Sequence, residues 1–277
     1  MNFAICTPEH ISESGSGGSW SMLKLVNSIN DRGHHATLAL CRDFYANNLN
    51  CNPTLPDDCI GIYPEAYRLN PLGTKRIVRW INYYPPNDLS IKDDELVLTY
   101  FPPYWRGADQ LWTFQYDRWM FRDMGLDRDG TTCYSIRKGG PRWQNKKLDQ
   151  HPNNAINVDE FVWPSYRNNG VINEKCYVDL AVLFNTCSRF ICYDHHTALS
   201  DFAAMCGIEV IVIPDGIRSV EKAVEDAPLN LAGQAWGFDD LERANSTRHL
   251  LPRLLIKNKQ DTDDSIDRLI EKCSHAW

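Results

Sequence analysis

The sequence of 277 residues lacks any long apolar run and any excess of positive charge. Its longest apolar stretch, around residues 210–213, is far shorter than the roughly 20 residues that cross a bilayer. The N-terminus has no positively charged leader followed by an apolar stretch, so no signal peptide is expected. The net charge of -7 offers no general attraction to nucleic acid or anionic membrane. We therefore expect a cytoplasmic protein with no integral membrane segment and no nucleic-acid partner.

Metal-binding patterns are also missing. The chain has ten cysteines but no C-x-x-C pair, and no cysteine–histidine cluster has zinc spacing. His195 and His196 are adjacent, and adjacent side chains point in different directions on regular structure. No third ligand has a suitable spacing, so no metal is expected. Four of the cysteines lie in or beside apolar segments, namely Cys6, Cys187, Cys192 and Cys206. The cysteines are interpreted as reduced thiols, although Cys51 and Cys59 could bridge a loop.

The first forty residues have the pattern of a βαβ unit, which predicts a parallel sheet. Residues 2–7 form an apolar strand, and a glycine-rich loop at residues 14–18 follows. Ser19 can cap a helix that ends at Gly33, and residues 35–40 form the second strand. The apolar face of the predicted helix has helical spacing and comprises Met22, Leu25, Val26 and Ile29. The glycines either let a ligand approach the helix N-terminus or form a flexible turn.

The rest of the chain alternates strands and helices, which predicts a second parallel sheet. Strands are predicted at residues 95–100, 131–136, 190–194 and 208–213. Helices are predicted at residues 75–84, 177–184, 197–206 and 238–250, with Thr262 capping a last helix. The predicted fold class is α/β, with two Rossmann-like domains facing a central cleft and helices at the C-terminus. Residues 1–125 form the first domain, and residues 126–277 form the second.

Ligands of parallel α/β sheets bind beyond the carboxyl ends of the strands, so the loops there are the candidate sites. Arg137, Lys138 and two glycines follow a predicted strand and suit a pyrophosphate, although a solvated basic turn has the same composition. Asp194 and Thr197 follow another strand, where they could contact a sugar and a phosphate or simply cap a helix. His10 or Glu9 could act as a general base, or both could be ordinary loop residues.

An aromatic loop at residues 101–105 follows the predicted strand at residues 95–100. Its rings could stack on a sugar face or could pack against the sheet.

Several fragments, in order along the chain, resemble GT-B-fold, nucleotide-sugar-dependent glycosyltransferases of the bacterial and viral glycan-biosynthesis type. The match to this family is densest from Cys192 to Ser200 and continues through Gly207 to Gly216. Shorter matches are Tyr63-Pro64-Glu65, Asn70-Pro71-Leu72, Arg79-Trp80, Ile136-Arg137-Lys138-Gly139, Ala235-Trp236-Gly237, Asp239-Asp240-Leu241 and Ala244. The chain resembles the family over most of its length.

The resemblance implies a donor site in the C-terminal half and acceptor contacts from the N-terminal half. Arg137, Lys138 and Gly139 would meet the diphosphate, and Asp194 and Thr197 would lie along the ribose and phosphates. Gly17 and Gly18 would let the N-terminal loop approach the donor. The resemblance also implies a nucleoside diphosphate sugar as co-substrate. The family generally needs no bound metal, so no cofactor is expected.

One position departs from the family pattern. The family usually carries a second acid eight positions after the first, where it holds the ribose hydroxyls. Counted from Asp194, this position is Phe202, and the adjacent Asp201 would face about 100° away on a regular helix. Asp201 is kept as a candidate donor contact.

The predicted function is glycosyl transfer from a nucleoside diphosphate sugar to an acceptor hydroxyl, with a glycan as the expected acceptor. Lys138 is expected to stabilise the departing diphosphate and His10 to act as the base. The alternative is a non-catalytic relative that binds glycan or nucleotide. A dehydrogenase is disfavoured because no G-x-G-x-x-G fingerprint follows the first strand.

Overall fold

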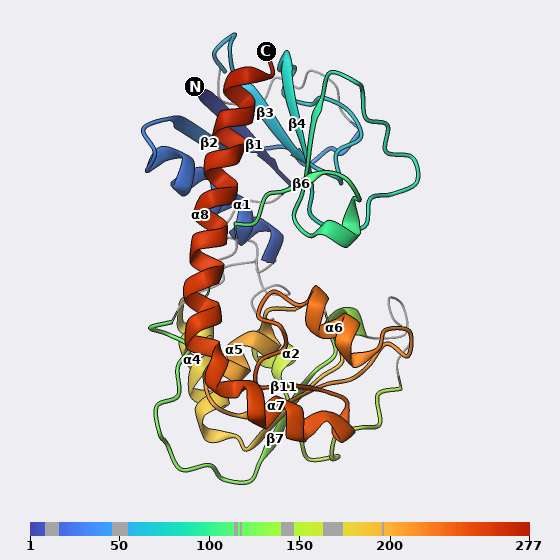
Figure 1. Ribbon diagram of the computed structural model, residues 1–277, viewed down its shortest axis with the longest axis vertical. Helices are drawn as coiled ribbons and strands as arrows, with labels where there is room; N and C mark the ends of the chain where they lie inside the picture. The colour runs from blue at the N-terminus through green and yellow to red at the C-terminus, as the bar shows by residue number, and fades with distance from the viewer. Residues whose placement is uncertain are drawn as a thin grey trace. The chain divides into compact units, whose positions relative to one another are not determined.

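The computed structural model describes residues 1–8, 17–45, 55–113, 116, 118–139, 147–162, 174–195 and 197–277. They form two compact units, each built on a parallel sheet (Figure 1). Unit 1 comprises Met1–Gln115 and Lys259–Trp277, and unit 2 comprises Tyr116–Asn258. The predicted α/β fold with two parallel sheets is confirmed. The division falls earlier than the expected boundary at residue 125, and Lys259–Trp277 belongs to unit 1 instead of the C-terminal unit.

The sheet of unit 1 has the strand order β2-β1-β3-β4-β5-β6, and each neighbouring pair is parallel. Its strands are β1 (Asn2–Thr7), β2 (His35–Leu40), β3 (Ile60–Pro64), β4 (Arg76–Ile81), β5 (Leu96–Thr99) and β6 (Asp109–Gln110). Helix α1 (Gly17–Asn30) connects β1 to β2, as the predicted βαβ unit requires. The short 3-10 helix η2 (Pro102–Tyr104) follows β5. The predicted apolar face of α1 is buried as expected.

The helix predicted at residues 75–84 is wrong, because this segment contains strand β4. Ile77, Val78, Trp80 and Ile81 are all buried. A strand covered on both faces loses the alternation of apolar and polar residues that identifies strands in sequence. Arg79 interrupts the apolar run, and its guanidinium forms a bidentate ion pair with Glu95 at 2.6 and 3.1 Å. The two side chains are only 3% and 2% exposed, so each charge depends on the other.

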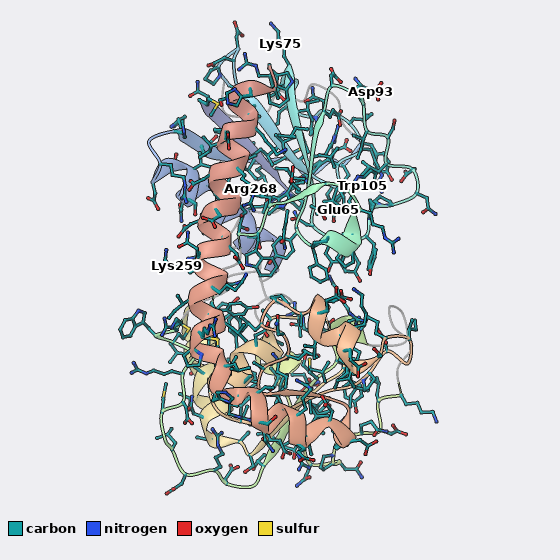
Figure 2. The ribbon with its side chains drawn as sticks, in the orientation of Figure 1. Glu65, Lys75, Asp93, Trp105, Lys259 and Arg268 are labelled. Atoms are coloured by element: carbon teal, nitrogen blue, oxygen red, sulfur yellow. The ribbon has the colours of Figure 1, made fainter. Side chains whose placement is uncertain are left out.

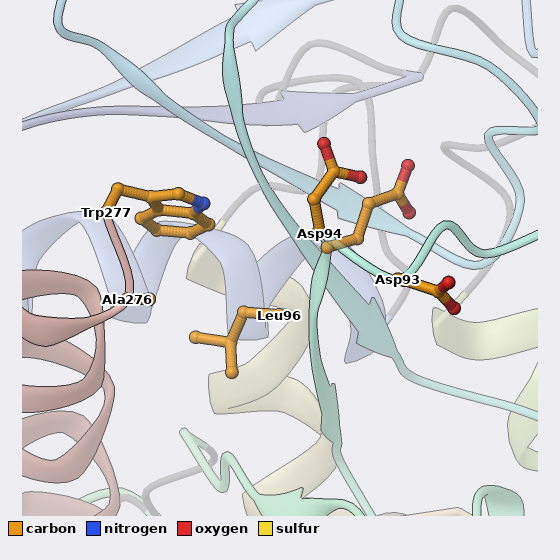
Figure 3. Close-up of a pocket in the computed structure, with 6 residues that line it drawn as sticks. Asp93, Asp94, Leu96, Ala276 and Trp277 are labelled. Carbon is orange, nitrogen blue, oxygen red and sulfur yellow. The ribbon is translucent and has the colours of Figure 1, made fainter.

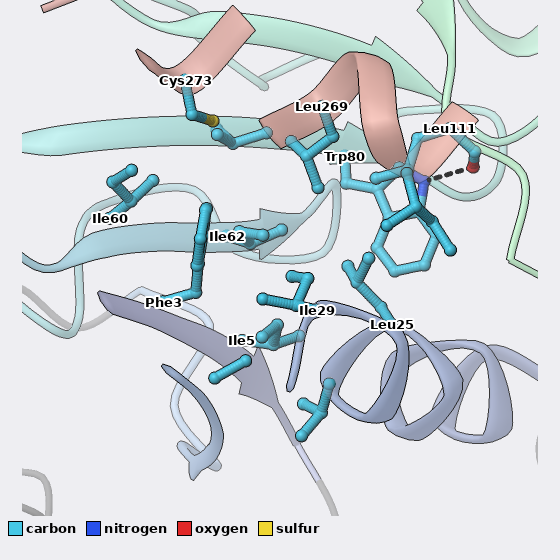
Figure 4. Close-up of a cluster of buried hydrophobic side chains, with 14 of the residues drawn as sticks. Phe3, Ile5, Leu25, Ile29, Ile60, Ile62, Trp80, Leu111, Leu269 and Cys273 are labelled. Carbon is cyan, nitrogen blue, oxygen red and sulfur yellow. Dashed lines mark hydrogen bonds between the residues drawn. The ribbon is translucent and has the colours of Figure 1, made fainter. Parts of the chain in front are cut away.

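The core of unit 1 includes residues from the end of the chain (Figure 4). Helix α8 (Leu251–His275) begins in unit 2 and ends in unit 1. Its residues Ile266, Leu269 and Cys273 join the apolar cluster formed by α1 and strands β1, β3 and β4. Thr262 does not cap a helix as predicted, because it lies buried within α8.

Helix α8 is also held to unit 1 by polar contacts. The hydroxyl of Ser265 donates to the carbonyl of Trp112 at 2.7 Å and accepts from the backbone N–H of Trp112 at 3.2 Å. Arg32, just after α1, forms ion pairs with Asp263 and Asp267. These contacts tie the last helix to segments that are far away in sequence.

The sheet of unit 2 has the order β11-β10-β9-β7-β8, again with parallel pairs throughout. The strands are β7 (Thr132–Ser135), β8 (Ile156–Asn157), β9 (Arg189–Cys192), β10 (Glu209–Val212) and β11 (Gln234–Trp236). The α-helices are α2 (Val158–Val162), α4 (Glu174–Thr186), α5 (Leu199–Met205), α6 (Val220–Asp226) and α7 (Leu241–Thr247). The 3-10 helices are η3 (Arg137–Gly139), η4 (Phe238–Asp240) and η5 (Arg248–Leu250). The helix predicted at residues 238–250 is therefore divided into η4, α7 and η5.

Eight of the described cysteines are buried free thiols: Cys6, Cys41, Cys59, Cys133, Cys187, Cys192, Cys206 and Cys273. Cys51, the potential bridging partner of Cys59, lies outside the described residues. Within the described ranges, no helix combines the length and the apolar character needed to cross a bilayer.

If the apolar face of α8 completes the core of unit 1, Leu269→Ala should lower the free energy of unfolding by about 2–5 kcal/mol. The loss combines the transfer free energy of the buried side chain with the cavity that remains. Urea unfolding followed by circular dichroism measures it. Ile256→Ala, at an exposed position of the same helix, is the control and should change stability by less than about 0.5 kcal/mol. Equal effects of the two substitutions would contradict the assignment.

Candidate functional site

The sheet of unit 2 contains a topological switch point between β7 and β9. Strand β8, which follows β7 in sequence, pairs with one side of β7, whereas β9 pairs with the other side and leads on to β10. Ligands of open α/β sheets bind at the carboxyl ends of the strands beside such a reversal. Residues 136–139 follow β7 there, and residues 193–197 follow β9.

Asp159, at the start of α2, holds the chain at the end of β7. Its carboxylate accepts hydrogen bonds from the Ser135 hydroxyl at 2.6 Å and from the backbone N–H groups of Ile136 and Arg137 at 2.7 and 3.0 Å. Arg137 has a φ of 37°, a left-handed conformation that costs energy for a residue with a side chain. The three bonds to Asp159 offset this cost and fix the backbone from which the Arg137 side chain extends.

The structure brings the predicted residues Arg137 and Thr197 together. Nη1 of Arg137 donates to Oγ1 of Thr197 at 3.2 Å, so one contact joins the segments that follow β7 and β9. Thr197 Oγ1 also accepts from the backbone N–H of Leu199 at 3.3 Å, at the start of α5. Lys138 is exposed beside Arg137. A guanidinium, an ammonium and a hydroxyl at a strand edge can together bind the oxygens of a phosphate.

Gly139 has a packing role. A Cβ atom at this position would lie 2.3 Å from the carbonyl oxygen of Tyr193, which is closer than any real contact. Glycine therefore lets the turn after β7 lie directly against the segment after β9. This close approach explains why a glycine follows the basic pair, and the expected contact of Gly139 with the donor stays a prediction.

Asp194 is buried two residues after β9, at the predicted end of the strand. Asp201 is buried in α5, where its carboxylate accepts from the Tyr116 hydroxyl and from Nε2 of Gln234, both at 2.7 Å. Burial raises the pKa of Asp201 to about 6, although these two hydrogen bonds oppose the shift. Both of its oxygens are thus engaged inside unit 2, and the expected donor contact of Asp201 stays a prediction.

Phe202, at the position where the family usually has its second acid, packs in the interior of unit 2. Its ring stacks on Phe121 with 4.0 Å between centroids and 11° between planes. It also makes an edge contact with Tyr116, whose hydroxyl bonds Asp201. Residues 201 and 202 thus belong to one buried cluster that stabilises α5.

A second polar cluster, not predicted from the sequence, is formed by residues at or just after the carboxyl ends of β9, β10 and β11. Asp215 accepts from the backbone N–H groups of Ile217 and Arg218 and from Nε of Arg218. Burial alone would raise the pKa of Asp215, but the bonds from Arg218 and Ile217 outweigh burial and lower it to about 2. Nε2 of His195 lies 3.9 Å from this carboxylate.

The indole of Trp236 packs against this second cluster. The guanidinium of Arg218 lies 5.0 Å from its ring centroid, and the His195 ring makes an edge contact with it. Nη2 of Arg218 is buried without a hydrogen-bond partner in the described structure. The available sequence signal was Pro214-Asp215-Gly216, an acidic turn directly after a predicted strand.

The remaining predicted residues receive less support. His10, Glu9, Gly140 and His196 lie outside the described residues, so the predicted base has no described position. Gly17 and Gly18 are the first two residues of α1, so the predicted glycine-rich loop leads directly into this helix. Across the described ranges, no group of three or more His, Cys, Asp or Glu side chains is placed to hold a metal.

A pocket of about 280 Å³ lies in unit 1, away from these residues in sequence (Figure 3). It is lined by Asp93, Asp94, Glu95, Leu96, Ala276 and Trp277. None of the predicted site residues lines it, and the carboxylate of Glu95 is paired with Arg79. The pocket therefore does not contribute to the candidate site.

The pKa of Asp201 generates a prediction about stability. Its carboxyl pKa is raised above that of the unfolded chain, near 4, so the folded state binds the proton more tightly. Unfolding free energy should fall by roughly 2–3 kcal/mol as pH rises from about 4 to 6, and the loss should then level off. Urea unfolding across this range should show this loss in the wild type but not in Asp201→Asn. An identical pH dependence of the two proteins would contradict the buried placement.

No protein-family model matches the chain, and no curated protein matches it. Two similar solved structures are of an α-glucosyltransferase in complex with UDP and a 13-mer DNA containing a HMU base. One is 11% identical with a TM-score of 0.38, covering 96% of this chain and 95% of that chain. The other is 11% identical with a TM-score of 0.40, covering 98% and 95%. The expectation of a glycan acceptor and no nucleic-acid partner is contradicted, because these neighbours were solved with UDP and DNA.

Proposed function

We propose that the chain is a glycosyltransferase that moves a sugar from a nucleoside diphosphate sugar to an acceptor hydroxyl. The diphosphate binds at the carboxyl edge of the sheet of unit 2, beside Arg137, Lys138 and Thr197. The observation that carries the proposal is the 3.2 Å contact between Arg137 and Thr197 at the switch point between β7 and β9. Two segments predicted separately from the sequence as phosphate ligands meet there.

The local geometry supports a preorganised anion site. Asp159 holds the backbone of Arg137 in a conformation that an unsupported residue rarely adopts. Such strain is characteristic of functional sites, where the surrounding structure maintains it. Donors that are already in place when charge develops on a leaving group need no reorganisation during the reaction, so they stabilise the transition state efficiently.

Arg137 and Lys138 contribute to the reaction by electrostatic stabilisation. The bond between the anomeric carbon of the sugar and the diphosphate oxygen breaks, and its electron pair stays on the diphosphate. The acceptor oxygen forms the new bond to the anomeric carbon and loses its proton to a base. Arg137 and Lys138 stabilise the increased negative charge of the departing diphosphate. His10 stays the predicted base, and Asp194 stays a predicted contact of the ribose or phosphates.

A second candidate is a protein that binds a nucleotide without turnover. It is favoured by the arrangement of Asp201 and Phe202, since neither offers a carboxylate oxygen to a ribose hydroxyl. Asp201 uses both oxygens within unit 2, and Phe202 stacks on Phe121. In this case the site would bind a nucleoside diphosphate but would neither hydrolyse nor transfer the attached sugar.

Titration of the protein with UDP, GDP and dTDP by calorimetry tests the donor site. One nucleotide should bind, and Arg137→Ala and Lys138→Ala should each weaken its binding about tenfold or more, because each removes a charge-assisted contact to phosphate. Lys92→Ala, at an exposed lysine of unit 1, is the matched control and should bind as the wild type does. If none of the three nucleotides binds, or if all variants bind alike, the donor-site assignment is wrong.

Turnover separates the two candidate functions. The diphosphate sugar of the nucleotide that binds should be consumed, with release of the free nucleoside diphosphate, when a suitable acceptor is present. Acceptors should include DNA containing a HMU base, as found in the structural neighbours. Binding of the nucleotide with neither hydrolysis nor transfer would favour the binding protein over the transferase.

A further inference from the structure

The carboxyl edge of the sheet in unit 1 carries a group of polar and aromatic residues that the donor site does not use. Glu65 follows β3, Asn82 follows β4, and Phe101 lies just beyond β5. These parallel strands are direct neighbours, so the three positions share one edge. The carboxylate of Glu65 accepts the backbone N–H of Asn82 at 2.8 Å, which joins the ends of β3 and β4. Figure 2 labels Glu65 and Trp105 on the segments that follow β3 and β5.

Four aromatic rings form a connected cluster at this edge. The ring centroid of Tyr104 in η2 lies 5.4 Å from that of Tyr83, 4.9 Å from that of Tyr84 and 5.5 Å from that of Phe101. Tyr83 and Tyr84 are also in contact, at 5.3 Å. Tyr84 is 52% exposed, so the cluster presents aromatic surface to solvent. A half-exposed tyrosine held in place by neighbouring rings is a suitable platform for stacking a planar group.

Asn82 adds hydrogen-bonding capacity next to these rings. Both polar atoms of its side chain, Oδ1 and Nδ2, are buried and have no hydrogen-bond partner in the described structure. Buried polar groups of this kind are rare, because leaving them unpaired costs stability. The adjacent Tyr83 belongs to the ring cluster, so the unpaired amide and the aromatic platform belong to one short segment.

We propose that Asn82 and the rings of Tyr83, Tyr84 and Tyr104 form a binding site for an unpaired nucleobase. The proposal rests on the proposed function and names the class of acceptor, a hydroxyl carried on a base of single-stranded or locally opened nucleic acid. The base stacks on the exposed tyrosine, and the amide of Asn82, buried in the unbound protein, becomes accessible on binding and pairs with the edge of the base. An amide carries a donor and an acceptor side by side, which matches the hydrogen-bonding edge of a base.

The charge of the chain favours an unpaired base over the duplex backbone as the recognised group. A protein that binds duplex DNA through its phosphates needs an excess of cations, whereas this chain has a net charge of -7. Stacking and edge pairing need no such excess, because they recognise the base itself. Bases removed from a helix for chemistry are held in this way, between aromatic surface and polar groups that read their edge.

Fluorescence anisotropy with 5′-labelled single-stranded oligonucleotides tests the site, in the absence of any donor nucleotide. Oligomers of dT, dA and dC should reveal binding to at least one base. The same backbone carrying abasic positions should bind at least tenfold more weakly. Tyr84→Ala and Asn82→Leu should each weaken binding of the preferred oligomer about tenfold. Tyr45→Ala, at another exposed tyrosine of unit 1, should bind as the wild type does.

The stability of the Asn82 variants distinguishes a ligand-binding role from a structural one. Asn82→Leu should keep or raise the urea midpoint, because it removes an unpaired buried amide, while it weakens oligonucleotide binding. A lower midpoint with unchanged binding would mean that Asn82 supports the fold only. Asn82→Ser and the exposed Tyr84→Ala keep the test valid if Asn82→Leu fails to fold.

Three further outcomes would overturn the proposal. The first is binding of the abasic oligomer as tight as that of the oligomer with bases. The second is oligonucleotide binding by Tyr84→Ala as tight as that of the wild type. The third is binding of maltoheptaose, a glycan, without binding of any oligonucleotide. The result is separable from the donor site, because Arg137→Ala should weaken nucleoside diphosphate binding and leave oligonucleotide binding unchanged. Failure of only one of the two assays therefore identifies which assignment is wrong.

Discussion

Parallel pairing of the strands is the constraint on which the rest of this structure depends. In both sheets the chain must cross back to the same end of the sheet before the next strand starts, so the carboxyl ends of all the strands lie at one edge. In unit 2 this geometry brings the segments after β7 and β9 close enough for Arg137 to reach Thr197. In unit 1 the same geometry places Glu65, Asn82 and the ring cluster along one edge.

Local patterns predicted helix α1 and the continuous apolar strands β1, β9 and β10, but they did not predict β4. The spacing of the apolar residues identified α1, because one face of that helix is buried and the other is not. It failed for β4, because burial on both faces removes the period of two and Arg79 interrupts the apolar run that would otherwise indicate a buried strand. The cap predicted at Thr262 is also wrong, because this residue has the chemistry of a cap but lies inside the long helix α8. A cap and a buried helical threonine differ only in what surrounds them.

The same distinction applies to the candidate site. Arg137 and Thr197 were predicted because each lies in the segment that follows a strand, a position that sequence can reveal. Asp159 was not, because it acts through backbone groups more than twenty positions away, and nothing local marks that contact. Asp201 had suitable chemistry, but its neighbours Tyr116 and Gln234 come from distant segments and engage both of its oxygens.

Helix α8 makes unit 1 discontinuous in sequence, with consequences for synthesis and dissection. Residues Ile266, Leu269 and Cys273 are made after the whole of unit 2, yet they complete the core of unit 1, whose strands are made before unit 2. During translation, the nascent N-terminal unit exposes the apolar surface that these residues later cover. A fragment that ends at Gln115 would keep that surface uncovered and should aggregate, whereas a synthetic peptide corresponding to Lys259–Trp277 could restore it by fragment complementation.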